Sequence, residues 1–232
     1  SWVIGQPDFA SGATDAGPAG LNTPLGLTYD FAEKRLFVAD YGNQRVLMYN
    51  LDAGITNGMN AAVVFGQPDF SSSGSSGGAA RLTNPNAVAF DPVTKRLFVS
   101  DSSNARVMVF EAANPTSGAD AGFVIGQPDF STYSIGNAPE KLSAPSTMEV
   151  DSLRRRLFVA NANRVLVYDL NLLATGMNAS TTIGIQSFRD TNRIASQTNV
   201  PSVNGLALAE SAGRLFVADP KAYRVLVFDV TP

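Results

Sequence analysis

The chain has 232 residues, of which 44% are hydrophobic and 16% charged, and its net charge is −3. This balance is typical of a folded protein, because disordered chains combine few apolar residues with a high net charge. Nucleic acid is not an expected partner of an acidic chain with 13 Arg and 4 Lys. Insertion into a membrane is not expected either, because no run of 18 apolar residues is present. The absence of Cys and His excludes disulfides, the usual zinc sites and Ser-His or Cys-His catalysis.

An apolar block that ends in Gly-Gln-Pro-Asp-Phe opens the chain at Val3–Phe9. It recurs at 64–70 and 124–130, and a diverged copy occupies 182–188. Three further blocks follow each copy in a fixed order, and their first examples are Gly26–Asp30, Arg35–Asp40 and Arg45–Tyr49. The Arg-Leu-Phe-Val block returns at Arg96, Arg156 and Arg214, which are spacings of 61, 60 and 58 residues. The sequence therefore contains an internal repeat, and each repeat has four blocks.

Each block is short, rich in Val, Leu, Phe and Tyr, and bounded by turn residues, which indicates a β-strand. Four strands per repeat, with apolar residues on both faces, are typical of the blades of a β-propeller. The sequence thus predicts an all-β protein, a single β-propeller domain over residues 1–232 with four blades of four antiparallel strands. The expected repeats are approximately 10–70, 71–130, 131–188, and 189–232 with 1–9. The last repeat lacks an outer strand, so we expect the N-terminal strand to join the last blade and close the ring. A piece of a larger ring is the alternative.

The runs Pro24–Asp30, Leu36–Asp40 and Asn43–Val46 resemble the NHL repeat. Repeats two and four keep most of this pattern, whereas repeat three has Asn161 in place of the Asp and a shorter turn before Arg164. The resemblance implies a β-propeller that binds partners through its loop face. NHL repeats are usually shorter than these and usually form six-bladed rings.

Polar residues that recur in every repeat are expected to serve the fold. Asp40, Asp101 and Asp219 each end a strand, and an Arg follows five residues later. We expect each Asp to accept hydrogen bonds from turn N–H groups and to pair with that Arg. Asp8, Asp69 and Asp129 could be imagined as catalytic acids, but we expect them on outer strands, far from a central channel. No general base recurs beside them, so we interpret them as residues that serve the fold.

Function is expected where the repeats differ. The connectors 10–23, 71–84, 131–144 and 189–200 are long and unlike one another, and the turns that follow the strand-ending Asp or Asn also vary. The predicted partner-binding face consists of Tyr41, Asn43, Ser103, Asn104, Lys221 and Tyr223.

Glu149 interrupts an inner strand whose other copies have Thr28, Ala89 and Ala207. A carboxylate in the central channel of a propeller could bind Ca²⁺ or Na⁺ together with backbone carbonyls, so Glu149 is the candidate metal ligand. The alternative is that it pairs with Arg154 or a nearby amide. No other cofactor and no catalytic residue are expected.

The predicted function is a non-catalytic binding or scaffold β-propeller that presents its loop face to a protein, peptide or glycan. Two alternatives remain: a metal-dependent enzyme similar to propeller lyases or lactonases, and an architectural repeat of a larger surface protein. The composition, poor in Lys and rich in small polar residues, favours an extracellular or periplasmic location. The sequence does not predict an oligomeric state.

Overall fold

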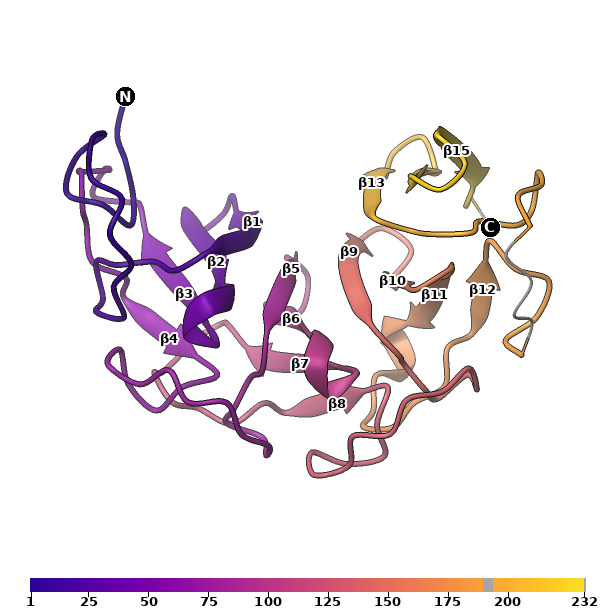
Figure 1. Ribbon diagram of the computed structural model, residues 1–232, viewed down its shortest axis with the longest axis horizontal. Coiled ribbons are helices and arrows are strands. Elements are labelled where there is room, and N and C mark those ends of the chain that lie inside the picture. The colour runs from indigo at the N-terminus through magenta and orange to yellow at the C-terminus, as the bar shows by residue number, and fades with distance from the viewer. Residues whose placement is uncertain (190–193, 232) are drawn as a thin grey trace. The chain divides into compact units, whose positions relative to one another are not determined.

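The computed structural model describes residues 1–189 and 194–231, and this part of the chain is built from β-strands and three short 3-10 turns (Figure 1). The strands form four antiparallel sheets, which confirms the all-β class. The first sheet contains β1 (Pro24–Asp30), β2 (Arg35–Asp40), β3 (Arg45–Asn50) and β4 (Val63–Phe65). The second contains β5 (Pro85–Asp91), β6 (Arg96–Asp101), β7 (Arg106–Glu111) and β8 (Phe123–Ile125). The third contains β9 (Pro145–Asp151), β10 (Arg156–Asn161), β11 (Arg164–Asp169) and β12 (Thr181–Ile183), and the fourth β13 (Gly205–Ala209), β14 (Arg214–Asp219) and β15 (Arg224–Asp229).

Neighbours in each sheet are also neighbours in sequence, as expected of hairpin-connected strands. The second and third strands pair in the same register in the first, third and fourth sheets, so that Asp40 lies opposite Arg45 and Asp219 opposite Arg224. The fourth sheet has three strands, as the sequence predicts, and β15 is one of its two edge strands. Turns η1 (Tyr41–Asn43) and η2 (Ser102–Asn104) follow β2 and β6, and η3 (Leu170–Leu172) follows β11.

The outer strands are shorter than the seven-residue blocks predicted for them. β4, β8 and β12 have three residues each and stop before Gly66, Gly126 and Gly184, whose φ angles are +78°, +89° and +89°. The left-handed conformation at these glycines turns the chain away from the sheet. The prediction of a strand at Val3–Phe9 is wrong for the described conformation, since residues 4–10 form bends and Gly5 has the same positive φ of +89°.

Burial along the third strands shows that β3, β7 and β11 are covered on both faces. The first five residues of β3, β7 and β11 are all buried, whereas β15 alternates between half-buried and exposed residues. The continuous apolar run therefore predicts a third strand covered on both faces correctly in three repeats, whereas β15 carries the same run with one face exposed.

The chain divides into two compact units, residues 1–101 with 108–122, and residues 102–107 with 123–232. In the first unit, Phe37 of β2 stacks on Phe90 of β5 with ring centroids 5.5 Å apart. In the second, Phe158 and Val165 of the third sheet share a buried cluster with Leu215 and other residues of the fourth sheet. Each unit thus has its own hydrophobic core, formed where one sheet packs against the next.

Candidate functional site

The Arg that begins the third strand forms hydrogen bonds with the second strand, the connector and the outer block. Arg45 is completely buried, and its Nε donates to Oδ2 of Asp40 at 2.7 Å. Nη1 donates to the carbonyl of Phe70 at 2.6 Å, and Nη2 to the carbonyls of Gly17 and Gly20 at 3.0 and 3.1 Å. The expected Asp–Arg pair is confirmed here. The contacts with backbone carbonyls, which the sequence did not predict, also hold the connector and the end of the outer block.

The contact with the Phe carbonyl recurs. Arg106 Nη1 donates to the carbonyl of Phe130 at 2.7 Å, and Arg164 Nη1 donates to the carbonyl of Phe188. In each case the acceptor is the last residue of the outer block that follows the Arg in the chain. Three repeats therefore use one Arg nitrogen to fix the end of the outer block.

Oδ1 of the Asp that ends the second strand accepts a hydrogen bond from a backbone N–H just before the first strand of the same repeat. Asp40 Oδ1 accepts from Asn22 N at 2.6 Å, and Asp101 Oδ1 accepts from Thr83 N at 2.6 Å. In the third repeat, Oδ1 of Asn161 accepts from Ser143 N at 2.9 Å. The Asn therefore replaces the Asp as an acceptor but brings no negative charge.

The Gly-Gln-Pro-Asp segments hold the connectors. The amide nitrogens of Gln6, Gln67 and Gln127 donate to the carbonyl seven residues later, at 2.8, 2.9 and 3.0 Å. Oδ1 of Asp8, Asp69 and Asp129 accepts the N–H groups two and three residues later. The pKa of all three carboxyls is lowered, for Asp8 and Asp69 chiefly by hydrogen bonds from serine hydroxyls and for Asp129 chiefly by the backbone N–H groups. These contacts serve the fold, as expected, but the three Asp residues lie in bends and not on outer strands as predicted.

The residues predicted for the partner-binding face lie in different environments. Asn43 is a buried framework residue, and its Nδ2 donates to the Asp15 carbonyl and to Asp40 Oδ2, both at 2.9 Å. It is therefore withdrawn from the candidate face. Tyr41 and Asn104 are half-buried, and the Tyr41 hydroxyl accepts from Asn84. The exposed members are Ser103, Lys221 and Tyr223, and Tyr223 is 95% exposed. The exposed connector residue Ile135, at 74%, was not predicted.

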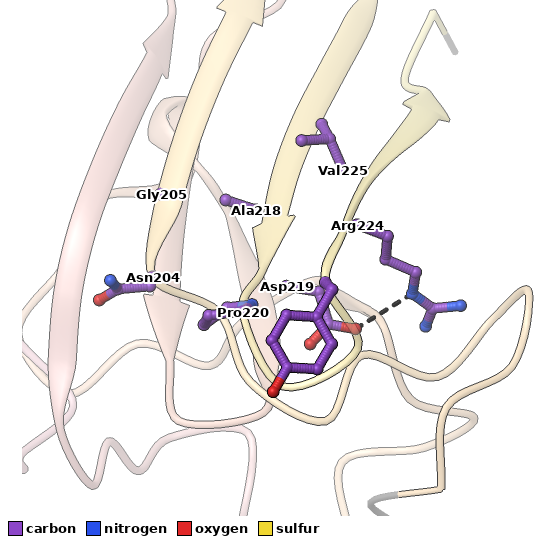
Figure 2. A pocket seen from close by; sticks show the side chains of 8 residues that line it. Asn204, Gly205, Ala218, Asp219, Pro220, Arg224 and Val225 are labelled. Atoms are coloured by element: carbon purple, nitrogen blue, oxygen red, sulfur yellow. Dashed lines mark hydrogen bonds and ion pairs between the residues drawn. The ribbon is translucent and has the colours of Figure 1, made fainter.

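An open hollow of about 600 Å³ lies at the end of the fourth sheet (Figure 2). Its lining comes from the start of β13, the end of β14 and the start of β15, with the turn that contains Pro220 and Tyr223. Asp219 and Arg224 lie side by side in it, joined by a contact of 3.1 Å between Oδ2 and Nε. The volume is within the range of ligand sites in proteins.

Both charged groups of this hollow have hydrogen-bonding capacity left. Asp219 is 1% exposed, yet no described residue donates to its Oδ1. The strand register places Pro201 where Asn22 and Thr83 stand in the first two repeats, and proline has no N–H to donate. Arg224 Nη2 donates to the Asn199 carbonyl at 2.7 Å, and Nη1 has no acceptor among the described residues. The repeated Asp and Arg do not reveal this difference in the sequence, but Pro201 could have indicated it, because a proline there leaves the Asp219 carboxylate without a backbone donor.

Glu149 lies on β9, opposite Phe158, and is half-buried. It forms no hydrogen bond or ion pair with any described residue, so the predicted alternative of a pair with Arg154 is wrong, and Arg154 instead contacts Asp151 and the carbonyls of Glu210 and Thr231. Burial raises the pKa of Glu149 to about 7. Within residues 1–189 and 194–231, no three His, Cys, Asp or Glu side chains gather as metal ligands.

Among the same residues, no helix has the length and apolar character needed to span a membrane. No protein-family model and no curated protein sequence matches this chain.

Proposed function

We propose that this protein is a non-catalytic binding or scaffold β-propeller of the NHL-repeat type, which presents a loop face to a protein, peptide or glycan. In this proposal residues 1–232 form one domain of four blades, and the N-terminal strand completes the last blade. The composition supports an extracellular or periplasmic location for it.

The observation that carries the proposed function is that repeated side chains hold the framework whereas variable side chains are exposed. The repeated Arg, Asp and Gln side chains hold the backbone of the connectors from inside, as Arg45 holds Gly17 and Gln127 holds Ser134. The side chains that differ between repeats, such as Ile135 and Tyr223, are exposed. A rigid framework that displays variable loops is a common basis for binding sites.

The four-bladed ring is supported by the contacts of residues 1–9. Gly118 N and Gly176 N donate to the carbonyls of Val64 and Val124, which belong to outer strands. Gly58 N donates to the carbonyl of Val3 at 3.1 Å in the same way. The first segment therefore makes one of the contacts of an outer strand while no strand is paired with it.

Arrays of glycans and of peptides, probed with the purified protein, test the proposed function. We expect a ligand whose binding falls at least tenfold in the double variant Lys221→Ala/Tyr223→Ala, because both side chains are exposed on the same turn and Tyr223 also lines the hollow. Leu153→Ala is the control, since Leu153 is 66% exposed in the turn between β9 and β10.

Two results would contradict this function. One is the absence of any ligand whose binding depends on Lys221 and Tyr223. The other is metal-dependent turnover of a lactone or glycan that a single Asp or Glu substitution abolishes, which would favour the enzyme instead.

A further inference from the structure

The open edge of the fourth sheet differs from the corresponding strands of the other sheets. Val225 and Val227 of β15 are 62% and 54% exposed, whereas Val46 and Val165, which match Val225, are completely buried. The edge also has no strand paired with it among the described residues. An apolar edge of this kind is suited to the addition of one extended strand.

Arg224, which lines the hollow beside this edge, has counterparts that bind an outer block in the other repeats. Arg45, Arg106 and Arg164 each use Nη1 to bind the carbonyl of the Phe that ends an outer block. Arg224 occupies the same position in its repeat, and its Nη1 has no acceptor among the described residues. A backbone carbonyl at the end of an added strand would give Nη1 of Arg224 the kind of acceptor that its counterparts have.

We infer that Arg224 is the recognition residue of the β15 edge and that it selects residues 1–9 of this chain by binding the carbonyl of Phe9. This inference rests on the closed ring of the proposed function and deepens it, because it names the group that identifies the closing strand. Within residues 1–232, the copy of Gly-Gln-Pro-Asp-Phe at 5–9 is the one not bound by a preceding Arg.

The register of the added strand follows from the paired outer strands. Val46 lies opposite Phe65 and Met48 opposite Val63, and the third sheet repeats this register. Applied to β15, it places Ile4 opposite Val225 and Trp2 opposite Val227. Trp2 and Phe9 are 64% and 67% exposed in the described conformation, so docking would cover apolar surface at both ends of the segment.

Amide hydrogen exchange of residues 2–9 in the full chain tests the role of Arg224. Arg224→Met keeps the apolar stem and removes the donors, so we expect exchange in this segment to accelerate about tenfold or more, the usual effect of losing a hydrogen bond to a charged group. Arg214→Met is the matched control, because Arg214 is the first residue of β14, at the opposite end of the sheet from Arg224, and pairs with the exposed Asp229. Exchange of residues 2–9 should be unchanged in Arg214→Met.

Acrylamide quenching of Trp2, the single tryptophan of the chain, provides a second readout. We expect stronger quenching in Arg224→Met than in the wild type and in Arg214→Met. Equal exchange and equal quenching in all three proteins would overturn the inference, even if a cross-link between the strands shows that the ring closes. Protection that grows with protein concentration would also overturn it, because a second copy would then supply the strand.

Discussion

Arg164 differs from its counterparts because its neighbour carries no charge. Arg45 pairs with Asp40, whereas the residue opposite Arg164 is Asn161. Arg164 is 1% exposed, no described residue accepts from its Nη2, and burial lowers its pKa. A buried cation without a carboxylate is costly, so this position is a weak point of the third repeat.

Asn161→Asp should therefore stabilise the protein by about 1–3 kcal/mol at pH 7, the usual range for a charged hydrogen bond. The new carboxylate keeps the oxygen that accepts from Ser143 N and adds the ion pair seen in the first repeat. Because Arg164 would lower the pKa of this Asp in the folded state, the gain should be lost as the pH falls toward that pKa. Urea unfolding at pH 7 and pH 3 measures both effects, and a less stable variant at pH 7 would contradict this explanation.

Glu149 should make stability depend on pH. Its pKa of about 7 in the folded protein lies above the ordinary value of 4.5. The raised pKa means that the folded state binds the proton more tightly, so the contribution of Glu149 is complete below pH 4.5 and is lost as the pH rises through 7. Glu149→Gln should thus match the wild type at pH 4.5 and exceed its stability by about 1–3 kcal/mol at pH 8. Thermal unfolding across this pH range measures the difference, and an equal profile for both proteins would contradict the shift.

The same pair of proteins tests the candidate cation site. If Glu149 binds calcium, the melting temperature of the wild type should rise progressively as the calcium concentration is raised, for example from about 5 to about 50 times the dissociation constant. The melting temperature of Glu149→Gln should not change. Identical melting with calcium and with chelator in both proteins would refute a site at Glu149.

At the scale of the element, the glycine that ends each outer strand determines where the chain leaves the sheet. Gly66 has φ +78°, and a Cβ atom at this position would lie 2.3 Å from Cδ1 of the buried Leu82. Both the backbone conformation and the space therefore require glycine.

Gly66→Ala should destabilise the protein by about 1–3 kcal/mol, because the left-handed conformation and the contact with Leu82 both add cost. Gly74 is a control in the adjoining connector, where a Cβ would meet nothing within 4 Å. Gly74→Ala should change stability by less than about 0.5 kcal/mol. Chemical denaturation of the two variants makes the comparison, and similar midpoints would show that the turn tolerates a side chain.

The strands were predictable from sequence because each block repeats, and repetition separates strand residues from connectors that vary. The block at Val3–Phe9 shows the limit of this reasoning, since an identical pattern forms bends where no strand is paired with it. The amino-acid pattern of a block does not determine which strand it pairs with. Among the residues predicted for the partner-binding face, Tyr223 is exposed, whereas Asn43 is buried and its side chain donates to the connector. Sequence spacing does not reveal such a hydrogen bond between a connector and a turn.

At the scale of the whole molecule, each of the two units exposes apolar residues on one of its strands. β1 exposes Leu25 and Leu27, at 50% and 62%, and β15 exposes Val225 and Val227. Val88 of β5 is buried at the position of Leu27, and Val165 and Val167 of β11 are buried at the positions of Val225 and Val227. Closing a ring would remove this surface from water, which is the main source of stability that the proposed four-bladed propeller offers.

Disulfide trapping tests closure of the ring most directly, because the chain has no cysteine of its own. In the proposed register Trp2 and Val227 lie opposite each other, where Cβ atoms are about 4.5–5.5 Å apart. The double variant Trp2→Cys/Val227→Cys should form a disulfide within one chain under mild oxidation, and Trp2→Cys/Val225→Cys, two residues out of register, should form it far more slowly. Mass spectrometry and non-reducing electrophoresis identify the product. A disulfide within the chain at the predicted pair is the result we expect; no disulfide, or one that joins two chains, would contradict closure by the N-terminal strand.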